Sequence, residues 1–174
     1  MIKIPKPLEG EYPSYAPHYI NLVPDDGQII VHLRDAMQTT LALMSSLSPE
    51  KQGTPCAEGE WTAKEILSHI MDSERIFCYR ALRFARNDAT ALNGFDHDTY
   101  VLHSCANEQE LSALLEEYTA IRQASITLFK NLDEQALICQ GMVNNNSFSV
   151  RALAYMIAGH EQHHLNSIRE HYAT

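Results

Sequence analysis

The stretch VRALAYMIAGHEQHHLNSIREHY, residues 150–172, decides the fold and contains three of the nine histidines of this chain within HEQHH, residues 160–164. Its apolar residues recur at intervals of three and four, which is typical of an amphipathic helix that buries one face. Ser147 or Ser149 stands where a helix-capping side chain is needed. We therefore predict a long helix that starts at one of these serines and ends near Tyr172.

Three earlier segments show the same helical periodicity. They span residues 25–47, 62–86 and 107–132. Thr62 is followed at capping-box distance by Glu65, and Asn107 is followed at the same distance by Glu110. No segment shows the alternation expected of a strand. Four amphipathic helices predict an all-α four-helix bundle, in which functional sites are built from inward side chains on facing helices.

Two segments outside these helices differ in character. Residues 1–24 carry five prolines, which forbid a continuous helix and favour an extended arm that packs over the body. Residues 87–104, NDATALNGFDHDTYVLHS, contain turn formers and no sustained period, so we predict a long loop between the second and third helices. Loops of this length are often functional. The predicted organisation is an arm over residues 1–24 and a bundle over residues 25–174.

Length, charge and cysteine content narrow the class of protein. The chain has 174 residues, enough for one domain, and a formal net charge of −9, which argues against nucleic acid and anionic membranes as partners. No stretch approaches the roughly 20 apolar residues that span a bilayer, and we expect a cytoplasmic protein. The cysteines form no CxxC pair and are expected to be reduced thiols. They are Cys56, Cys78, Cys105 and Cys139.

The histidines of the last helix are the strongest candidates for chemistry. At about 100° per residue, His160 and His164 fall on the apolar face, whereas His163 lies nearer its edge. Two imidazoles spaced i, i+4 can converge on one divalent ion. His171 is on the right face but about 16 Å away along the helix. Inward histidines are also common as hydrogen-bonded core residues, so both interpretations stay open for the pair.

A third ligand from another helix would favour the metal interpretation. His69 stands at the border of the apolar face of the second helix, a position that suits either a ligand at the mouth of a bundle or a half-exposed histidine. His32, His97 and His103 are weaker candidates. Glu161 follows His160 but should point toward the flank of the apolar face, which distinguishes HEQHH from the HExxH motif of zinc proteases.

Three stretches resemble the DinB-like, or YfiT-like, family of metalloenzymes, which includes bacillithiol S-transferases and mycothiol-dependent maleylpyruvate isomerases. These are EWTAKEILSHIMDSERIFCYRALRFAR, GFDHDTYV and residues 150–172. The resemblance covers about residues 25–173 and implies a four-helix bundle with a divalent ion, usually zinc or nickel. It implies His69, His160 and His164 as the ligands, and a loop over residues 94–101 that covers the mouth of the site. Nothing transfers to the proline-rich arm.

Three neutral imidazoles leave the charge of a bound ion uncompensated, so that the ion can activate a thiol or a water molecule. The resemblance implies an enzyme that transfers a low-molecular-weight thiol to an electrophilic small molecule. Two alternatives remain: a metal-dependent hydrolase of a small amide or ester, and a non-enzymatic, stress-associated protein that binds a metal or a partner.

Further expectations concern the catalytic groups and the assembly of the chain. Asp96 and Tyr100 are the candidate catalytic residues, and Asp72 and Glu161 could also orient ligands or transfer protons. Acidic side chains on helices more often belong to solvated faces. A homodimer is common in the family that the chain resembles. Apolar residues that could support it are Tyr79, Phe84 and Phe129, although a place in the core is the simpler interpretation of all three.

Overall fold

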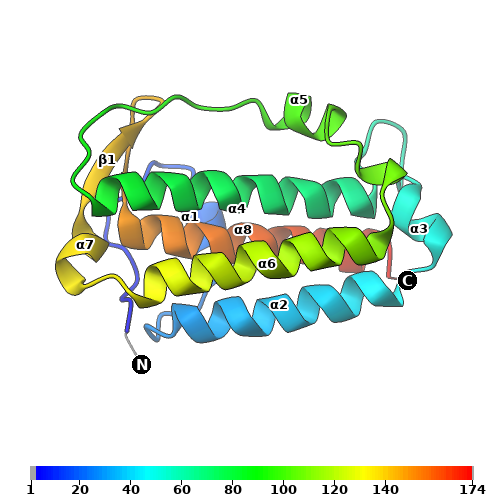
Figure 1. Cartoon of the computed structure of the whole chain (residues 1–174), viewed down its shortest axis with the longest axis horizontal. Helices are drawn as coiled ribbons and strands as arrows, with labels where there is room; N and C mark the ends of the chain where they lie inside the picture. The colour runs from blue at the N-terminus through cyan, green and yellow to red at the C-terminus, as the bar shows by residue number, and fades with distance from the viewer. Residues whose placement is uncertain (1–2, 174) are drawn as a thin grey trace.

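Four long helices that lie side by side form the body of the chain in the computed structural model, which describes residues 3–173 (Figure 1). They are α2 (Ile29–Ser46), α4 (Ala63–Ala85), α6 (Leu111–Lys130) and α8 (Val150–His171). Helices α4 and α8 share the most extensive contact, and α2 and α6 close the bundle on its other side. The predicted four-helix bundle is confirmed.

Two of the predicted helix-capping interactions are present in the structure. The capping box at α4 is present, because Thr62 Oγ1 accepts from the Glu65 amide at 3.1 Å and the Thr62 amide donates to the Glu65 carboxylate at 2.8 Å. Ser149 caps α8 by accepting from the Ala152 amide at 3.0 Å. The predicted cap at Asn107 is wrong: α6 begins only after Glu110.

Two helices begin later than predicted, because the polar side chains expected at their starts form other hydrogen bonds. Asn107 lies in the short helix η1 (Ala106–Glu108) and accepts a hydrogen bond from Thr62 Oγ1 at 2.7 Å, which ties this turn to the start of α4. Helix α2 starts at Ile29 rather than at residue 25 or 26. Asp26 instead accepts from the Gln28 amide at 2.8 Å, a turn that precedes the helix.

A small hairpin precedes α8, so the prediction of no strand is wrong. Strands β1 (Gln140–Val143) and β2 (Asn146–Ser149) pair in antiparallel register. Asn144 and Asn145 form the turn with φ values of 47° and 62°. Two successive residues with positive φ match the right-handed twist of a hairpin, and asparagine tolerates this conformation well. The strands are too short for their alternation to stand out in the sequence.

Short helices occupy the connections between the long ones. They are α3 (Pro49–Gly53), α5 (His97–Leu102) and α7 (Glu134–Ile138). Residues 87–104 cross the molecule alongside α4, as Figure 1 shows, and contain α5 and a bridge between Leu92 and Val143. The predicted crossing loop therefore has some regular structure of its own.

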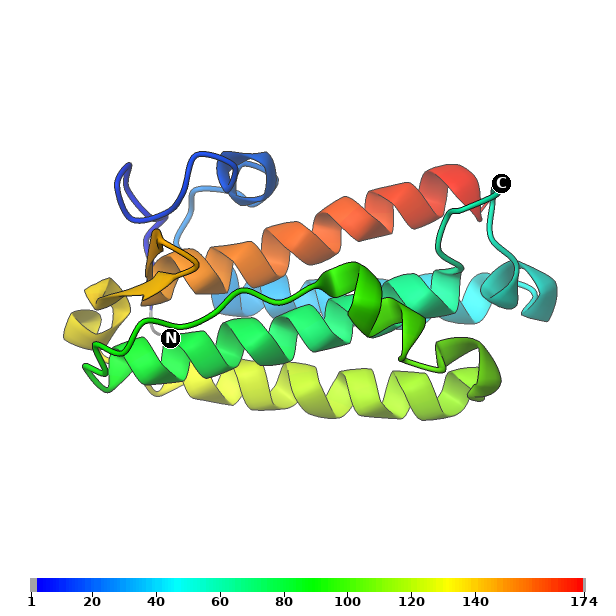
Figure 2. The ribbon, with the colours of Figure 1, turned by 90° about the horizontal axis from the view of Figure 1, so that it is seen from above.

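The N-terminal arm packs on the bundle along α8 (Figure 2). It contains α1 (Pro17–Ile20) and several turns, so the predicted extended conformation holds only in part, and it buries Ile4 and Ile20. Gly159 of α8 permits this contact, since a Cβ atom at that position would lie 2.2 Å from the carbonyl oxygen of Tyr19. The Glu11 carboxylate accepts from Arg151 Nε at 2.7 Å and holds the arm at the start of α8.

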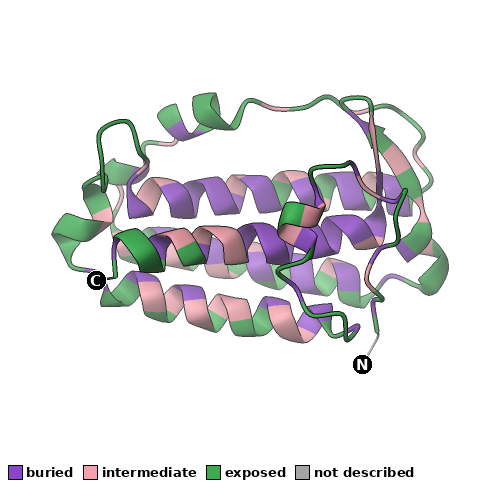
Figure 3. Ribbon diagram, turned by 180° about the vertical axis from the view of Figure 1, so that it is seen from behind, coloured by how far each residue is buried: buried purple, intermediate pink, exposed green. Residues whose placement is uncertain are grey.

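Buried residues line the facing sides of the four helices (Figure 3). Phe84 and Phe129 belong to this core, with exposed fractions of 1% and 0%, which confirms the simpler interpretation of both and removes them from any dimer surface. Tyr79 is exposed and accepts a hydrogen bond from Arg83. The homodimer stays a prediction. All four cysteines are free, and in the described part of the chain no helix combines the length and apolarity needed to cross a membrane.

Candidate metal centre

Three histidines from two helices meet inside the bundle. His69 comes from α4, and His160 and His164 come from α8. The Nε2 atom of His160 lies 2.9 Å from Nε2 of His69 and 3.1 Å from Nε2 of His164. His69 and His160 are each 7% exposed, and His164 is half-buried. The structure thus brings together the three residues that the sequence singled out as ligands.

Burial keeps these imidazoles neutral. It lowers the pKa of His69 to about 4, with a further contribution from the charge of His97. It lowers the pKa of His164 to about 3, and it holds the pKa of His160 well below the ordinary value. A neutral imidazole has a free lone pair on one ring nitrogen, which is the form that binds metals. At neutral pH the three side chains are ready to act as ligands.

The donor set fits a divalent transition ion. Histidine nitrogens bind zinc at about 2.0–2.1 Å, so two of them on one ion lie about 3 Å apart at common coordination angles. The two short Nε2 separations have this size, and the three ligand atoms all lie within 4.8 Å of one another. Imidazole nitrogen suits zinc, nickel, copper and iron. Three protein ligands leave coordination positions for a substrate or water.

The cluster forms part of the wall of a cavity of about 330 Å³. The arm, α4, the segment just before α4 and the connection 87–104 all contribute aromatic side chains to this wall, which are Tyr15, Tyr19, Trp61, Phe77 and Phe95. The Trp61 ring lies 4.9 Å from the His69 ring, and the Tyr19 ring lies 5.5 Å from the His160 ring. A cavity of this size and character suits a small organic molecule.

Residues 94–101 supply only part of the wall, through Gly94, Phe95 and His97. Asp96 caps α5 by accepting from the Thr99 amide at 3.2 Å, and Tyr100 is 46% exposed with its ring 5.2 Å from Phe95. Neither residue lines the cavity, so the structure does not bring the two candidate catalytic residues to the histidines. Their roles remain predictions.

Three further residues considered in the sequence, Asp72, His163 and His97, lie outside the cluster of three histidines. Asp72 is half-buried and pairs with Arg75 at 3.5 Å. His163 stays outside the cluster, as its place on the helix predicted, with its ring 4.9 Å from His18. His97, a weak candidate from the sequence, lies at the rim with its ring 5.7 Å from the His69 ring. The sequence feature that pointed to His97 was its position in the GFDHDTYV stretch.

Tyr19, Trp61 and Arg80 line the cavity, and no pattern in the sequence predicted this. Tyr19 reaches the site only because the arm folds back onto α8, a contact between distant segments that no local pattern reports. Trp61 stands in the sequence just before the predicted second helix, and Arg80 lies among the charged residues of α4. Only the three-dimensional structure shows that these three residues line the same cavity.

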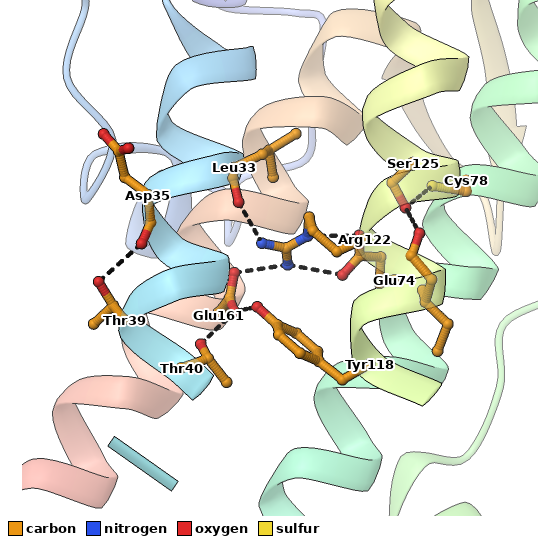
Figure 4. A network of polar contacts seen from close by, with 11 residues as sticks. Leu33, Asp35, Thr39, Thr40, Glu74, Cys78, Tyr118, Arg122, Ser125 and Glu161 are labelled. Atoms are coloured by element: carbon orange, nitrogen blue, oxygen red, sulfur yellow. Dashed lines mark hydrogen bonds and ion pairs between the residues drawn. The ribbon is translucent and has the colours of Figure 1, made fainter. Parts of the chain in front are cut away.

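A charged network inside the bundle includes Glu161, which is buried and not part of a solvated face (Figure 4). Glu161 is fully buried, and its carboxylate accepts from Thr40 Oγ1 at 2.7 Å and from the Tyr118 hydroxyl. Its second oxygen lies 2.7 Å from Arg122 Nη2, as an ion pair rather than a well-aligned hydrogen bond. The burial of a carboxylate is possible here because three donors surround it.

Arg122 joins this network to the remaining helices. Its guanidinium donates to the Glu74 carboxylate at 2.8 and 2.9 Å and to the carbonyl oxygen of Leu33 at 3.0 Å. Although burial alone would lower its pKa, the charges of Glu161 and Glu74 hold the pKa well above the ordinary value. The network therefore connects all four long helices and fixes α4 and α8, which carry the three histidines.

Comparison with known proteins agrees with this geometry. The sequence model of the DinB superfamily matches residues 32–168. A curated relative from Oceanobacillus iheyensis, named "Putative metal-dependent hydrolase OB0413", is 26% identical over 129 residues, which is 72% of this chain and 73% of the relative.

Two solved structures share the fold. YfiT from Bacillus subtilis, described as a probable metal-dependent hydrolase, is 16% identical with a TM-score of 0.77 over 84% of this chain and 85% of YfiT. A mycothiol-dependent maleylpyruvate isomerase is 11% identical with a TM-score of 0.67, over 84% of this chain and 61% of the isomerase. At these identities the likeness concerns the fold alone.

Proposed function

This chain belongs to the DinB superfamily, and from that premise we propose that it is a divalent-metal-dependent enzyme that transfers a low-molecular-weight thiol to an electrophilic small molecule. One observation carries the proposal: three neutral imidazoles from α4 and α8 converge at the wall of an aromatic cavity. Zinc and nickel are the ions that we propose for the site.

Each part of the site has a role in this chemistry. An ion held by three imidazoles keeps its full charge and acts as a Lewis acid, which lowers the pKa of a bound thiol or water. His69, His160 and His164 hold the ion. The aromatic wall provides apolar surface for the substrate and limits the access of water. His97, at the rim, is placed to accept the proton that the nucleophile releases.

Among the described residues no carboxylate lines the cavity, and this favours a thiol over water as the nucleophile. In the HExxH metalloproteases, a glutamate next to a ligand histidine acts as the general base. Glu161 has that position in the sequence, but its carboxylate is engaged by Thr40, Tyr118 and Arg122. A thiol, with an ordinary pKa of about 8.5, loses its proton at neutral pH far more readily than water and depends less on such a base.

Hydrolysis of a small ester or amide is the second candidate function. It is supported by the names of the Oceanobacillus relative and of YfiT, both of which refer to metal-dependent hydrolases. If the reaction is hydrolysis, His97 is the group available to activate water. Among the described residues it is the one histidine that lines the cavity and is not a candidate metal ligand. The same ligands serve both reactions, so the two functions differ in the nucleophile.

Spectroscopy of the cobalt-loaded protein separates these functions. Addition of 2-mercaptoethanol to Co²⁺-loaded protein should produce a sulfur-to-cobalt charge-transfer band, which His160→Ala should lack and the matched variant His163→Ala should retain. Absence of the band, together with hydrolysis of 4-nitrophenyl acetate that depends on His160, would replace the thiol proposal with the hydrolase. Absence of both with one bound cobalt ion would leave a metal-binding protein without this chemistry.

A further inference from the structure

Arg80 is a buried cation in the wall of the histidine cavity. The residue is 6% exposed, and its Nη2 donates to the carbonyl oxygen of Asn93 at 3.3 Å. Within the described part of the chain, no carboxylate lies at ion-pair distance from its guanidinium. A buried guanidinium is normally paired with an anion, because burial removes the water that stabilises its charge.

Arg122, the other buried arginine among the described residues, differs from Arg80 because it forms ion pairs. Arg122 is fully buried and is paired with both Glu74 and Glu161. The partly exposed Arg83 and Arg151 also pair with acidic residues, Asp88 and Glu11. Arg80 is the exception, and it is also the buried arginine that faces the cavity.

The composition of the wall strengthens the contrast. The chain carries 22 acidic residues against 13 lysines and arginines, yet over residues 3–173 no aspartate and no glutamate lines this cavity. Burial lowers the pKa of Arg80 from its ordinary value, an effect that the Tyr15 phenol opposes. A bound anion would relieve this unfavourable burial. The cavity is therefore suited to a negatively charged molecule.

The position of Arg80 defines where the negative charge of a ligand would lie. Its Cζ atom is 5.9 Å from the centre of the Phe77 ring and 5.7 Å from the centre of the Phe95 ring. The Phe77 ring in turn lies 6.0 Å from the His160 ring. Arg80 and His160 thus lie around the same aromatic ring, and the distance from Arg80 Cζ to the centre of the His160 ring cannot exceed the sum of the Phe77 distances.

We propose that the cavity binds a small carboxylate, with the carboxylate group on Arg80, an apolar middle on Phe77 and the reacting group at the three histidines. The location of the reacting group rests on the proposed function, whereas binding of the carboxylate does not require a metal. A single guanidinium matches a carboxylate in charge and in its paired hydrogen bonds. A phosphate dianion would retain a negative charge that no second cation of the wall neutralises.

Trp61 provides a local signal for a test in metal-free protein, since it is the only tryptophan and its ring lies 4.9 Å from the His69 ring. The probes are 4-phenylbutyrate and its neutral analogue 4-phenylbutyramide, titrated against tryptophan fluorescence. We expect the wild type to bind the acid at least about tenfold more tightly than the amide, as charged hydrogen bonds typically provide. Arg80→Met should remove this preference, and Arg80→Lys should keep part of it.

The controls make the result specific to Arg80. The amide should bind the wild type and Arg80→Met equally, which shows that the cavity is intact in the variant. Arg86→Met, which changes an exposed arginine at the end of the same helix, should behave as the wild type. Equal affinity for acid and amide in the wild type, an unchanged preference in Arg80→Met, tighter binding of 3-phenylpropyl phosphate, or no binding of any probe would overturn the proposal.

A second titration separates this proposal from the proposed function. Zinc-loaded protein should bind 6-mercaptohexanol through its thiol, and this binding should depend on His160. Failure there would count against the thiol chemistry and would leave the comparison of acid and amide in metal-free protein unaffected. Conversely, thiol binding without a preference for the carboxylate would retain the proposed function and remove the role of Arg80.

Discussion

The Glu161 carboxylate and the Arg122 guanidinium form an ion pair at 2.7 Å in the interior of the bundle, one residue beyond the candidate ligand His160. Two carboxylates share this guanidinium, so the hydroxyls of Thr40 and Tyr118 are needed to satisfy Glu161. Burial and the charge of Glu161 raise the pKa of Tyr118, which keeps its phenol protonated as a donor. Because the network fixes α4 and α8 relative to each other, it also fixes the relative positions of the three histidines.

Substitution of Arg122 should strongly destabilise the fold. Arg122→Met leaves Glu74 and Glu161 buried without their cation, and loss of one partner of a buried pair typically costs about 3–5 kcal/mol. Urea unfolding followed by circular dichroism measures the free energy of unfolding. Arg75→Met, which removes an exposed pair with Glu117, should cost less than about 1 kcal/mol. Equal losses in the two variants would contradict the role of the network.

Gly159→Ala should displace the N-terminal arm from α8. The added Cβ would lie 2.2 Å from the Tyr19 carbonyl oxygen, and overpacking of this kind costs about 1–3 kcal/mol, more than the helix gains from alanine. We expect a lower melting temperature and faster proteolysis within residues 1–24. Gly53→Ala is the control, because no atom lies within 4 Å of its added Cβ. An unchanged melting temperature for Gly159→Ala would show that the contact is not tight.

Attachment of the arm should weaken in acid. Although burial raises the pKa of the Glu11 carboxyl, hydrogen bonds from Arg151 and Ser149 outweigh this effect and hold the pKa below its ordinary value of 4.5. A lowered pKa in the folded state gives stability that is present above the unfolded pKa and is lost as pH falls through the folded pKa.

The test of this pH dependence compares the wild type with Glu11→Gln. The difference in unfolding free energy between them should shrink as pH falls below about 4.5. Glu9→Gln changes an exposed carboxylate in the same arm and should follow the wild type. A difference that stays constant with pH would mean that the Glu11 carboxylate does not contribute through its charge.

Zinc should stabilise the wild type against unfolding. A ligand that binds only the folded state adds about 2.7 kcal/mol when its free concentration is 100 times its Kd. Thermal unfolding with increasing zinc should therefore shift upward, and His164→Ala should abolish the shift. His171→Ala, an exposed histidine at the end of the same helix, should keep it. A shift of equal size in His164→Ala would place zinc elsewhere on the chain.

Periodic patterns and caps predicted the bundle because they are local properties of the sequence. Thr62 and Ser149 marked helix starts correctly, and the spacing of His160 and His164 placed both on one inward face. The burial of Glu161 was not predicted, because it depends on Arg122, a partner on another helix that no local pattern identifies. The places of Tyr19 and Arg80 in the cavity wall were not predictable for the same reason, since their contacts join separate segments of the chain.

The metal content of untagged protein, purified without chelating resin and measured by elemental analysis, tests the central claim most directly. We predict about one divalent ion per chain in the wild type and loss of that ion in His69→Ala, His160→Ala and His164→Ala. His163→Ala should keep the ion, because its ring packs on His18 outside the cluster. A wild type that takes up no ion after reconstitution with zinc or nickel, or ligand variants that retain one, would contradict the assignment of the three histidines as a metal centre.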